Sequence, residues 1–176
     1  IAATIILTSI GIGLFAFIAM PEISLSETQN SPTVTSQEVH EHALFHVVIN
    51  GSERDFTAEE FQLEAGHVHL ENNKSDIVHK HRSGVTWNEF FEPVPIAYYR
   101  SNATGNLCVE IETAVTCGEG QVVLNEGEAD TGNVIQQGDK FLIILNTENR
   151  TQIIDEYMKQ QLPQDYKPQR ITGRRL

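Results

Sequence analysis

Residues 43–49 are an apolar run, interrupted only by His46, whose side chains would alternate between two faces, and this pattern predicts a β-strand. Residues in step with Phe45 would face one side of a sheet, and residues in step with His46 would face the other. The pair Asn50-Gly51 follows directly and is a strong signal for a tight hairpin turn. We therefore expect residues 52–56 to return as a second strand. Two further segments, residues 61–70 and 77–81, also have the character of extended chain.

A helix start is specified at Thr86. The run Thr86-Trp-Asn-Glu89 has the sequence of a capping box, in which the Thr and Glu side chains satisfy each other's free backbone N–H groups. Trp87 and Phe90 then fall on one face of the helix, which favours a place in the core over a ligand pocket. Pro93 cannot continue the helix and should end it.

Short apolar runs bounded by Gly, Asn and Asp predict further strands at residues 107–116, 121–124 and 140–145. A hairpin, then a helix, then more strands is the order of an α+β domain that is mainly β with one packed helix. After residue 148, apolar residues recur at helical spacing, so we expect a short helix that docks before a polar, basic end.

This order of elements resembles the β-grasp (ubiquitin-like) arrangement. In that superfamily a strand ending in Asn-Gly or Asn-Glu, a variable stretch, Gly-Asp and an apolar last strand often close the sheet. The matching runs here are residues 122–126 and residues 138–144. The resemblance implies one helix packed on a mixed sheet.

The first 20 residues contain no charged side chain. As a helix rising ~1.5 Å per residue they would reach ~30 Å, the thickness of a bilayer's hydrocarbon core, so we expect a transmembrane anchor. A long signal sequence is one alternative, and a pilin-like helix within a filament is another that Pro21 weakens. Residues 21–38 are rich in Ser, Thr, Pro and Glu and should form a flexible linker.

The pattern therefore divides the chain into four parts. These are the anchor (1–20), the linker (21–38), a His-rich α+β domain (39–147) and a short helix with a basic tail (148–176). Four sequons are candidate glycosylation sites, at Asn50, Asn73, Asn102 and Asn149. Together with the anchor they favour a single-pass cell-membrane protein with an extracytoplasmic domain. The alternative is that these Asn and Ser or Thr residues only mark turns.

Charge narrows the range of partners. The chain has 12 Lys and Arg against 24 Asp and Glu, a formal net charge of −12. This argues against a nucleic-acid binder, since a phosphate backbone requires a basic face. We expect contact with membrane lipid through residues 1–20, and association with a membrane protein complex or with further copies of the chain.

The two cysteines, Cys108 and Cys117, are close enough in the sequence to face each other across a hairpin. That placement predicts a structural disulfide. A redox-active pair normally has the spacing C-x-x-C at a helix start, where the helix N-terminus lowers the thiol pKa. The spacing in this chain does not match.

Histidine is the main chemical signal, because all seven histidines lie within one short stretch of the sequence. Six of them form H-x-H pairs, His40 with His42, His67 with His69 and His79 with His81, and the seventh is His46. Residues two apart in a strand share a face, and neighbouring strands lie ~4.8 Å apart, so pairs on adjacent strands could converge on one cation. Imidazole-rich ligation suits copper or zinc. The predicted ligands are His40, His42, His69, His79 and His81, with His46 and His67 as weaker candidates. Four carboxylates lie near enough in sequence to assist them, Glu41, Glu64, Glu71 and Asp76.

Other interpretations of the histidines remain open. They could be exposed side chains with no ligand, or they could sense pH. A cupin is excluded because its Glu follows H-x-H by three or four residues, whereas Glu71 follows His69 by two. A blue-copper site is excluded because the last strands contain no His. No catalytic Ser-His-Asp set, phosphate loop or carboxylate pair is identifiable, which makes an enzyme the less favoured class.

One set of motifs resembles a known family. The motifs are His40-x-His42-Ala43, Asp55-Phe56, Val68-His69-x-Glu71, His79-Lys80-His81-x-x-Gly84-Val85-Thr86 and the spaced cysteines. Together they resemble a family of small membrane-anchored archaeal extracytoplasmic proteins, often labelled protein-disulfide isomerase or left without an assigned function. The resemblance covers residues 1–146 and supports the five stronger histidines, while His46 and His67 have no counterpart in it. The isomerase label finds no support in this chain, because C-x-x-C is absent.

These observations favour a membrane-anchored extracytoplasmic protein that binds copper or zinc, either alone or as an accessory subunit of a membrane complex. An extracellular thiol-disulfide oxidoreductase is an alternative from a different class. A structural subunit of a surface layer or filament is another.

Overall fold

A computed structural model of the chain describes residues 37–163. The anchor expected at residues 1–20, nearly all of the linker and the basic tail beyond residue 163 lie outside these residues. Within the described part, no helix has the length and apolar content needed to cross a bilayer.

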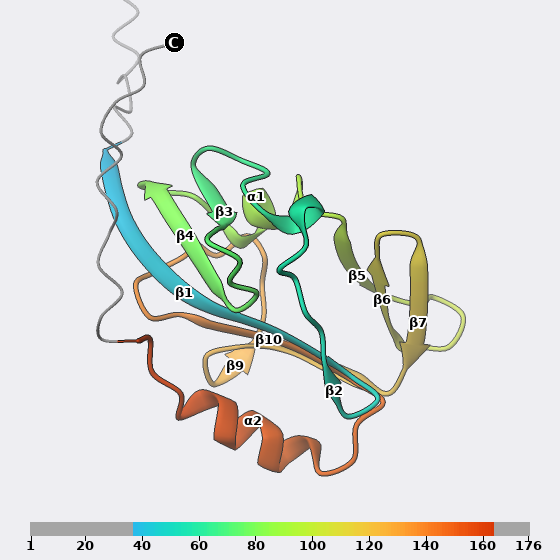
Figure 1. The fold of residues 1–176 in the computed structure, drawn as a ribbon. Helices are drawn as coiled ribbons and strands as arrows, with labels where there is room; N and C mark the ends of the chain where they lie inside the picture. The colour runs from blue at the N-terminus through green and yellow to red at the C-terminus, as the bar shows by residue number, and fades with distance from the viewer. Residues whose placement is uncertain (1–36, 164–176) are drawn as a thin grey trace, which may run out of the picture. The chain divides into compact units, whose positions relative to one another are not determined.

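A seven-stranded mixed sheet forms the centre of the described domain (Figure 1). Its order is β3-β4-β1-β10-β8-β9, and β2 pairs with β1. The strands are β1 (Glu38–Ile49), β2 (Ser52–Glu53), β3 (Val68–Leu70), β4 (Ile77–Arg82), β8 (Gly120–Leu124), β9 (Gly127–Glu128) and β10 (Lys140–Leu145). The long β1 and the apolar β10 are the parallel central pair, and the other pairings are antiparallel.

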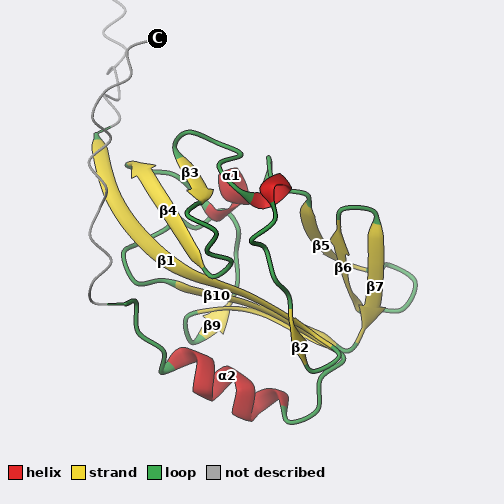
Figure 2. Cartoon of the chain, viewed as in Figure 1, coloured by secondary structure: helices red, strands yellow, loops and turns green. Residues whose placement is uncertain are grey.

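A second sheet and two α-helices complete the described domain (Figure 2). The sheet has the order β5-β6-β7, built from β5 (Ile96–Arg100), β6 (Leu107–Ile111) and β7 (Ala114–Gly118). The helical segments are the 3-10 turn η1 (Glu59–Phe61), α1 (Trp87–Phe91) and α2 (Arg150–Met158). The expectation of a mainly β, α+β domain is confirmed.

The alternation in β1 gives the main sheet two apolar faces. Residues in step with Phe45 enter the larger core, which also contains Trp87 and Phe90 of α1 and apolar residues of β5 and β6. Residues in step with Leu44 enter a smaller core that α2 covers with Tyr157. The helix α1 and the three-stranded sheet therefore lie on one side of the main sheet and α2 lies on the other (Figure 1).

Local signals in the sequence account for the start of α1 and the first hairpin. Thr86 accepts from the backbone N–H of Glu89, and the Glu89 side chain accepts from that of Thr86, so the capping box is present. Asn50 and Gly51 both have positive φ, 56° and 76°, as a type I′ hairpin turn requires.

Two strand predictions are too long. The ladder of β2 ends at Glu53, because the chain then leaves the sheet edge and places Phe56, only 1% exposed, in the larger core. The segment 61–70 is extended only at its end, in β3. The 3-10 turn η1 ends at its first residue, Phe61, and Leu63 has a φ of 58°, in the left-handed region and not in the β region.

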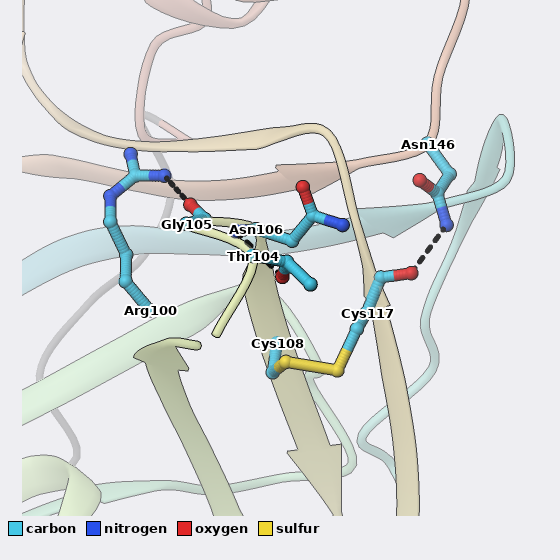
Figure 3. The surroundings of a disulfide bond; sticks show 7 residues. All are labelled: Arg100, Thr104, Gly105, Asn106, Cys108, Cys117 and Asn146. Atoms are coloured by element: carbon cyan, nitrogen blue, oxygen red, sulfur yellow. Dashed lines mark hydrogen bonds between the residues drawn. A yellow bond between two sulfur atoms is a disulfide. The ribbon is translucent and has the colours of Figure 1, made fainter. Parts of the chain in front are cut away.

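The cysteines lie opposite each other on β6 and β7 and form a disulfide, with their sulfur atoms 2.06 Å apart (Figure 3). Cys108 is buried and Cys117 is exposed. The Asn146 amide donates to the Cys117 carbonyl at 3.4 Å and so links this hairpin to the end of β10. The bond closes a strand pair and does not lie at a helix start, which is where thiols are activated.

Candidate metal centre

The strand register aligns three histidines across the α2-facing side of the main sheet. His42 on β1 is the register partner of His79 on β4, and His79 is in turn the partner of His69 on β3. Their rings are nearly or completely buried, with exposed fractions of 6%, 0% and 6%. The ring centroids of His42 and His79 are 4.6 Å apart, and those of His69 and His79 are 6.1 Å apart.

The other histidine of two H-x-H pairs lies two residues further along its strand, on the same face as this row. His40 and His81 are half-buried, and their ring centroids are 4.8 Å apart. His81 also lies 5.0 Å from His69 by the same measure. Three neighbouring strands thus bring together five imidazoles, which we call the histidine cluster: His40, His42, His69, His79 and His81.

Glu71 supplies a carboxylate to the cluster. It follows His69 by two residues and therefore points to the same face of β3. The turn after it is made by Asn72 and Asn73, both with positive φ, which returns the chain into β4. The Glu71 Oε1 atom lies 3.2 Å from His79 Nδ1, and Oε2 lies 3.3 Å from His69 Nε2.

Hydrogen bonding fixes the tautomer of His69. Its Nδ1 atom lies 2.6 Å from the carbonyl oxygen of Ala65, which can only accept, so Nδ1 carries the hydrogen. In the neutral ring the lone pair is then on Nε2, the atom that faces Glu71. A carbonyl partner on the far nitrogen is also how metal-binding histidines are usually oriented.

Other nitrogen atoms of the cluster also approach one another. The Nε2 atoms of His40 and His42 are 3.1 Å apart. Two ligands at about 2.1 Å from a tetrahedral ion would be about 3.4 Å apart, so this spacing suits a shared ion. The buried Nε2 of His81 has no hydrogen-bond partner among the described residues. Each of two groups, His40 with His42 and His79, and His69 with Glu71 and His81, has ligand atoms within 4.8 Å of one another and could hold a metal ion.

The opposite face of the same strands is held by a buried ion pair. Lys80 and Glu41 are register partners on β4 and β1, and their side chains form an ion pair. Lys80 is only 2% exposed and also donates to the carbonyl of Ile135. On the other edge of β1, the backbone N–H of His42 donates to the Gln137 side chain at 2.9 Å. These contacts fix the backbone on which the histidines stand.

Burial controls the charge of the cluster. Burial, reinforced by the neighbouring His42 and His69, lowers the pKa of His79 to about 3. Burial also lowers the pKa values of His42 and His81, and adjacent histidines act in the same direction. Neutral imidazole is the form that binds metal, and a lowered pKa keeps these three rings neutral at lower pH than an exposed histidine.

The two weaker candidates lie away from the cluster. His46 faces the same side as His42, but its ring packs 4.7 Å from that of Tyr157 on α2, and its Nδ1 contacts Glu53. His67 lies 3.2 Å from the carboxylate of Glu89 on α1. The assignment of metal ligands stays a prediction, while the division of the histidines into five and two is a feature of the structure.

Sequence reasoning missed the particular role of Glu71 and the ion pair behind the site. The spacing of His69 and Glu71 could have indicated that both side chains lie on one face, because they are two residues apart at the end of β3. No local pattern in the sequence indicates that Lys80 is buried. All four sequon asparagines are exposed. No protein-family model, curated protein or solved structure matches this chain.

Proposed function

We propose that this protein binds copper or zinc ions at the histidine cluster. The observation that carries the proposal is the convergence of ligand atoms: two groups of three ligand residues each have their ligand atoms within 4.8 Å of one another. In one of these groups the Nε2 atom of His69 lies 3.3 Å from the Glu71 carboxylate. A cation placed between an imidazole nitrogen and a carboxylate oxygen attracts both.

Burial, the set of donor atoms and the net charge all favour a transition-metal ion over a proton as the cation bound by the cluster. Burial holds the pKa of His79 near 3, so this ring stays neutral at ordinary pH. Imidazole nitrogen with one carboxylate is the donor set of many zinc and copper sites. The net charge of −12 also draws cations to the protein.

Metal titration of the full chain tests this proposal. We expect Zn²⁺ and Cu²⁺ to bind the wild type, and His79→Ala/His81→Ala to weaken binding by more than about 100-fold. Loss of a ligand should cost more than loss of a ligand's hydrogen-bond partner, which costs about 10–100-fold. The matched control is His46→Ala/His67→Ala, which removes two histidines outside the cluster and should bind as the wild type does. Equal binding by the cluster variant, or none by the wild type, would overturn the proposal.

We further propose that the domain works outside the cytoplasm, tethered to the cell membrane by residues 1–20. The uncharged N-terminal segment, the disulfide and four exposed sequons support this location. A metal-binding domain held at the membrane fits an accessory subunit of a membrane complex, or a homo-oligomer. We also propose that the chain is related to the family of archaeal membrane-anchored proteins that its motifs resemble. The relationship of the sheet to the β-grasp arrangement is likewise proposed, on its parallel first and last strands. Protease added to intact cells should cut within residues 21–38 and release the domain, whereas complete protection would contradict this topology.

A further inference from the structure

The ligand atoms of the cluster fall into two groups, and each is complete enough to hold an ion. One group is nitrogen alone, from His40, His42 and His79. The other has two imidazoles and a carboxylate, from His69, His81 and Glu71. Three protein ligands are what an open zinc site provides, with the fourth position left for water or another small ligand.

Glu71 lies between the two groups. Its Oε1 atom is 3.2 Å from His79 Nδ1 in the first group, and its Oε2 atom is 3.3 Å from His69 Nε2 in the second. A carboxylate that offers one oxygen to each of two neighbouring ions is a bridging ligand. The side chain is only 19% exposed, so few other positions are open to these oxygens.

We propose that the histidine cluster is a binuclear centre, with two divalent transition-metal ions bridged by Glu71. This inference rests on the proposed metal binding and adds its stoichiometry and geometry. The nitrogen-only group suits Cu²⁺ or Zn²⁺, and the His₂Glu group has the donor set of an open zinc site. Ions in two-metal sites are about 3.5–4 Å apart, which the contact of one carboxylate with both groups allows.

Electrostatics permit two ions so close together. Imidazole binds metal in its neutral form and then adds no charge. The Glu71 carboxylate therefore offsets only part of the charge of two divalent ions, and the net charge of −12 over the chain opposes the remainder. The cationic Lys80 adds little repulsion, because it points to the other face of the sheet and is paired with Glu41. The half-buried His40 and His81 are the side through which ions and solvent reach the centre.

Copper titration of the full chain tests the inference by stoichiometry and by electron paramagnetic resonance. We expect two equivalents of Cu²⁺ to bind, and the resonance intensity per copper to fall as the second binds, because bridged Cu²⁺ ions couple magnetically. One bound equivalent would overturn the binuclear centre and leave the proposed function standing. No bound copper or zinc would overturn both. Two equivalents with the full signal of isolated ions would contradict the bridge.

Glu71→Gln tests the bridge by itself. It keeps the size of the side chain and removes the charge, so the coupled signal should disappear and the second equivalent should weaken at least 10-fold. Glu53→Gln is the matched control, because Glu53 also contacts a histidine, His46, outside the cluster. If Glu71→Gln does not fold, His69→Ala/His81→Ala removes the second group and should bind a single uncoupled ion. A coupled pair in either variant would overturn the assignment of Glu71 and its group.

Discussion

The α2-facing side of the main sheet has two halves of opposite character. In one half, Leu44 and Val48 of β1 and Leu142 of β10 pack against α2 in a closed apolar core. In the other half, the same alternation of β1 places His40 and His42 beside the histidines of β4 and β3. One face of β1 thus carries apolar side chains that pack under α2 along one part of the strand, and histidines along the other part.

The two halves differ in what burial contributes. An apolar side chain gains stability when it leaves water, whereas a buried imidazole must find partners to recover the cost of desolvation. His79 is completely buried, with neighbours that are mainly imidazoles and one carboxylate. Stability alone would favour apolar residues there, which is why we attribute the histidine half to ion binding.

The largest expected change in stability comes from the apolar half. Leu142→Ala opens a cavity at a side chain with no exposure and should lower the free energy of unfolding by about 2–5 kcal/mol. Metal affinity of the folded protein should not change, because the cluster lies on other strands. Denaturant unfolding and metal titration at the same temperature measure the two effects. A parallel loss of affinity would show that the halves are coupled.

Metal should stabilise the protein only through the histidine half. At free Zn²⁺ equal to 100 times the dissociation constant, binding at one site should raise the free energy of unfolding by about 2.7 kcal/mol. Leu142→Ala should gain the same increment from its lower starting point, whereas His79→Ala/His81→Ala should gain almost nothing. Thermal unfolding with zinc and with a chelator measures this difference, and an unchanged increment in the cluster variant would contradict it.

Acid should weaken the metal-free protein through the same half. The pKa of His79 is lowered to about 3 by burial and by His42 and His69, so in acid the unfolded chain binds a proton there that the folded chain does not. Stability is therefore unaffected above the unfolded pKa of 6.5 and falls below it, by on the order of 2 kcal/mol by about pH 4.5 from this residue. His79→Gln should flatten the profile of unfolding free energy against pH between about 6.5 and 4.5. An identical slope in both proteins would contradict the depressed pKa.

The smallest expected effect separates His46 from the cluster on its own strand. His46 packs on Tyr157 and contacts Glu53, so His46→Ala should lower the free energy of unfolding by about 1 kcal/mol. It should leave metal affinity within twofold of the wild type. A larger change in affinity than in stability would place His46 with the ligands.

Local signals predicted much of the fold. The capping box at Thr86, the turn at Asn50-Gly51 and the apolar run of β10 each act over a few residues, so the sequence reveals them directly. The lengths of β2 and β3 were not predictable in this way. These lengths depend on contacts between residues that are distant in the sequence. The burial of Phe56 in the larger core ends β2, and pairing with a neighbouring strand limits how far each ladder extends.

The candidate site shows the same limit. Alternation placed each H-x-H pair on one face, and β1, β4 and β3 are indeed neighbours. Register is what aligns His42, His79 and His69 in one row. His67 lies in a bend just before β3, outside the alternation of the strand, so it does not share a face with His69 and contacts Glu89 of α1 instead. A sequence pattern does not contain that register, because it is set by pairing across the whole sheet.

The most direct test of metal binding by five histidines and not by seven is nuclear magnetic resonance of the imidazole nitrogens. Full chain labelled with ¹⁵N at histidine would be titrated with Zn²⁺, with signals assigned by single His→Gln variants. We predict that the coordinating nitrogens of His40, His42, His69, His79 and His81 shift on binding, while those of His46 and His67 do not move. No shift at any cluster histidine, or a shift confined to His46 and His67, would contradict the account.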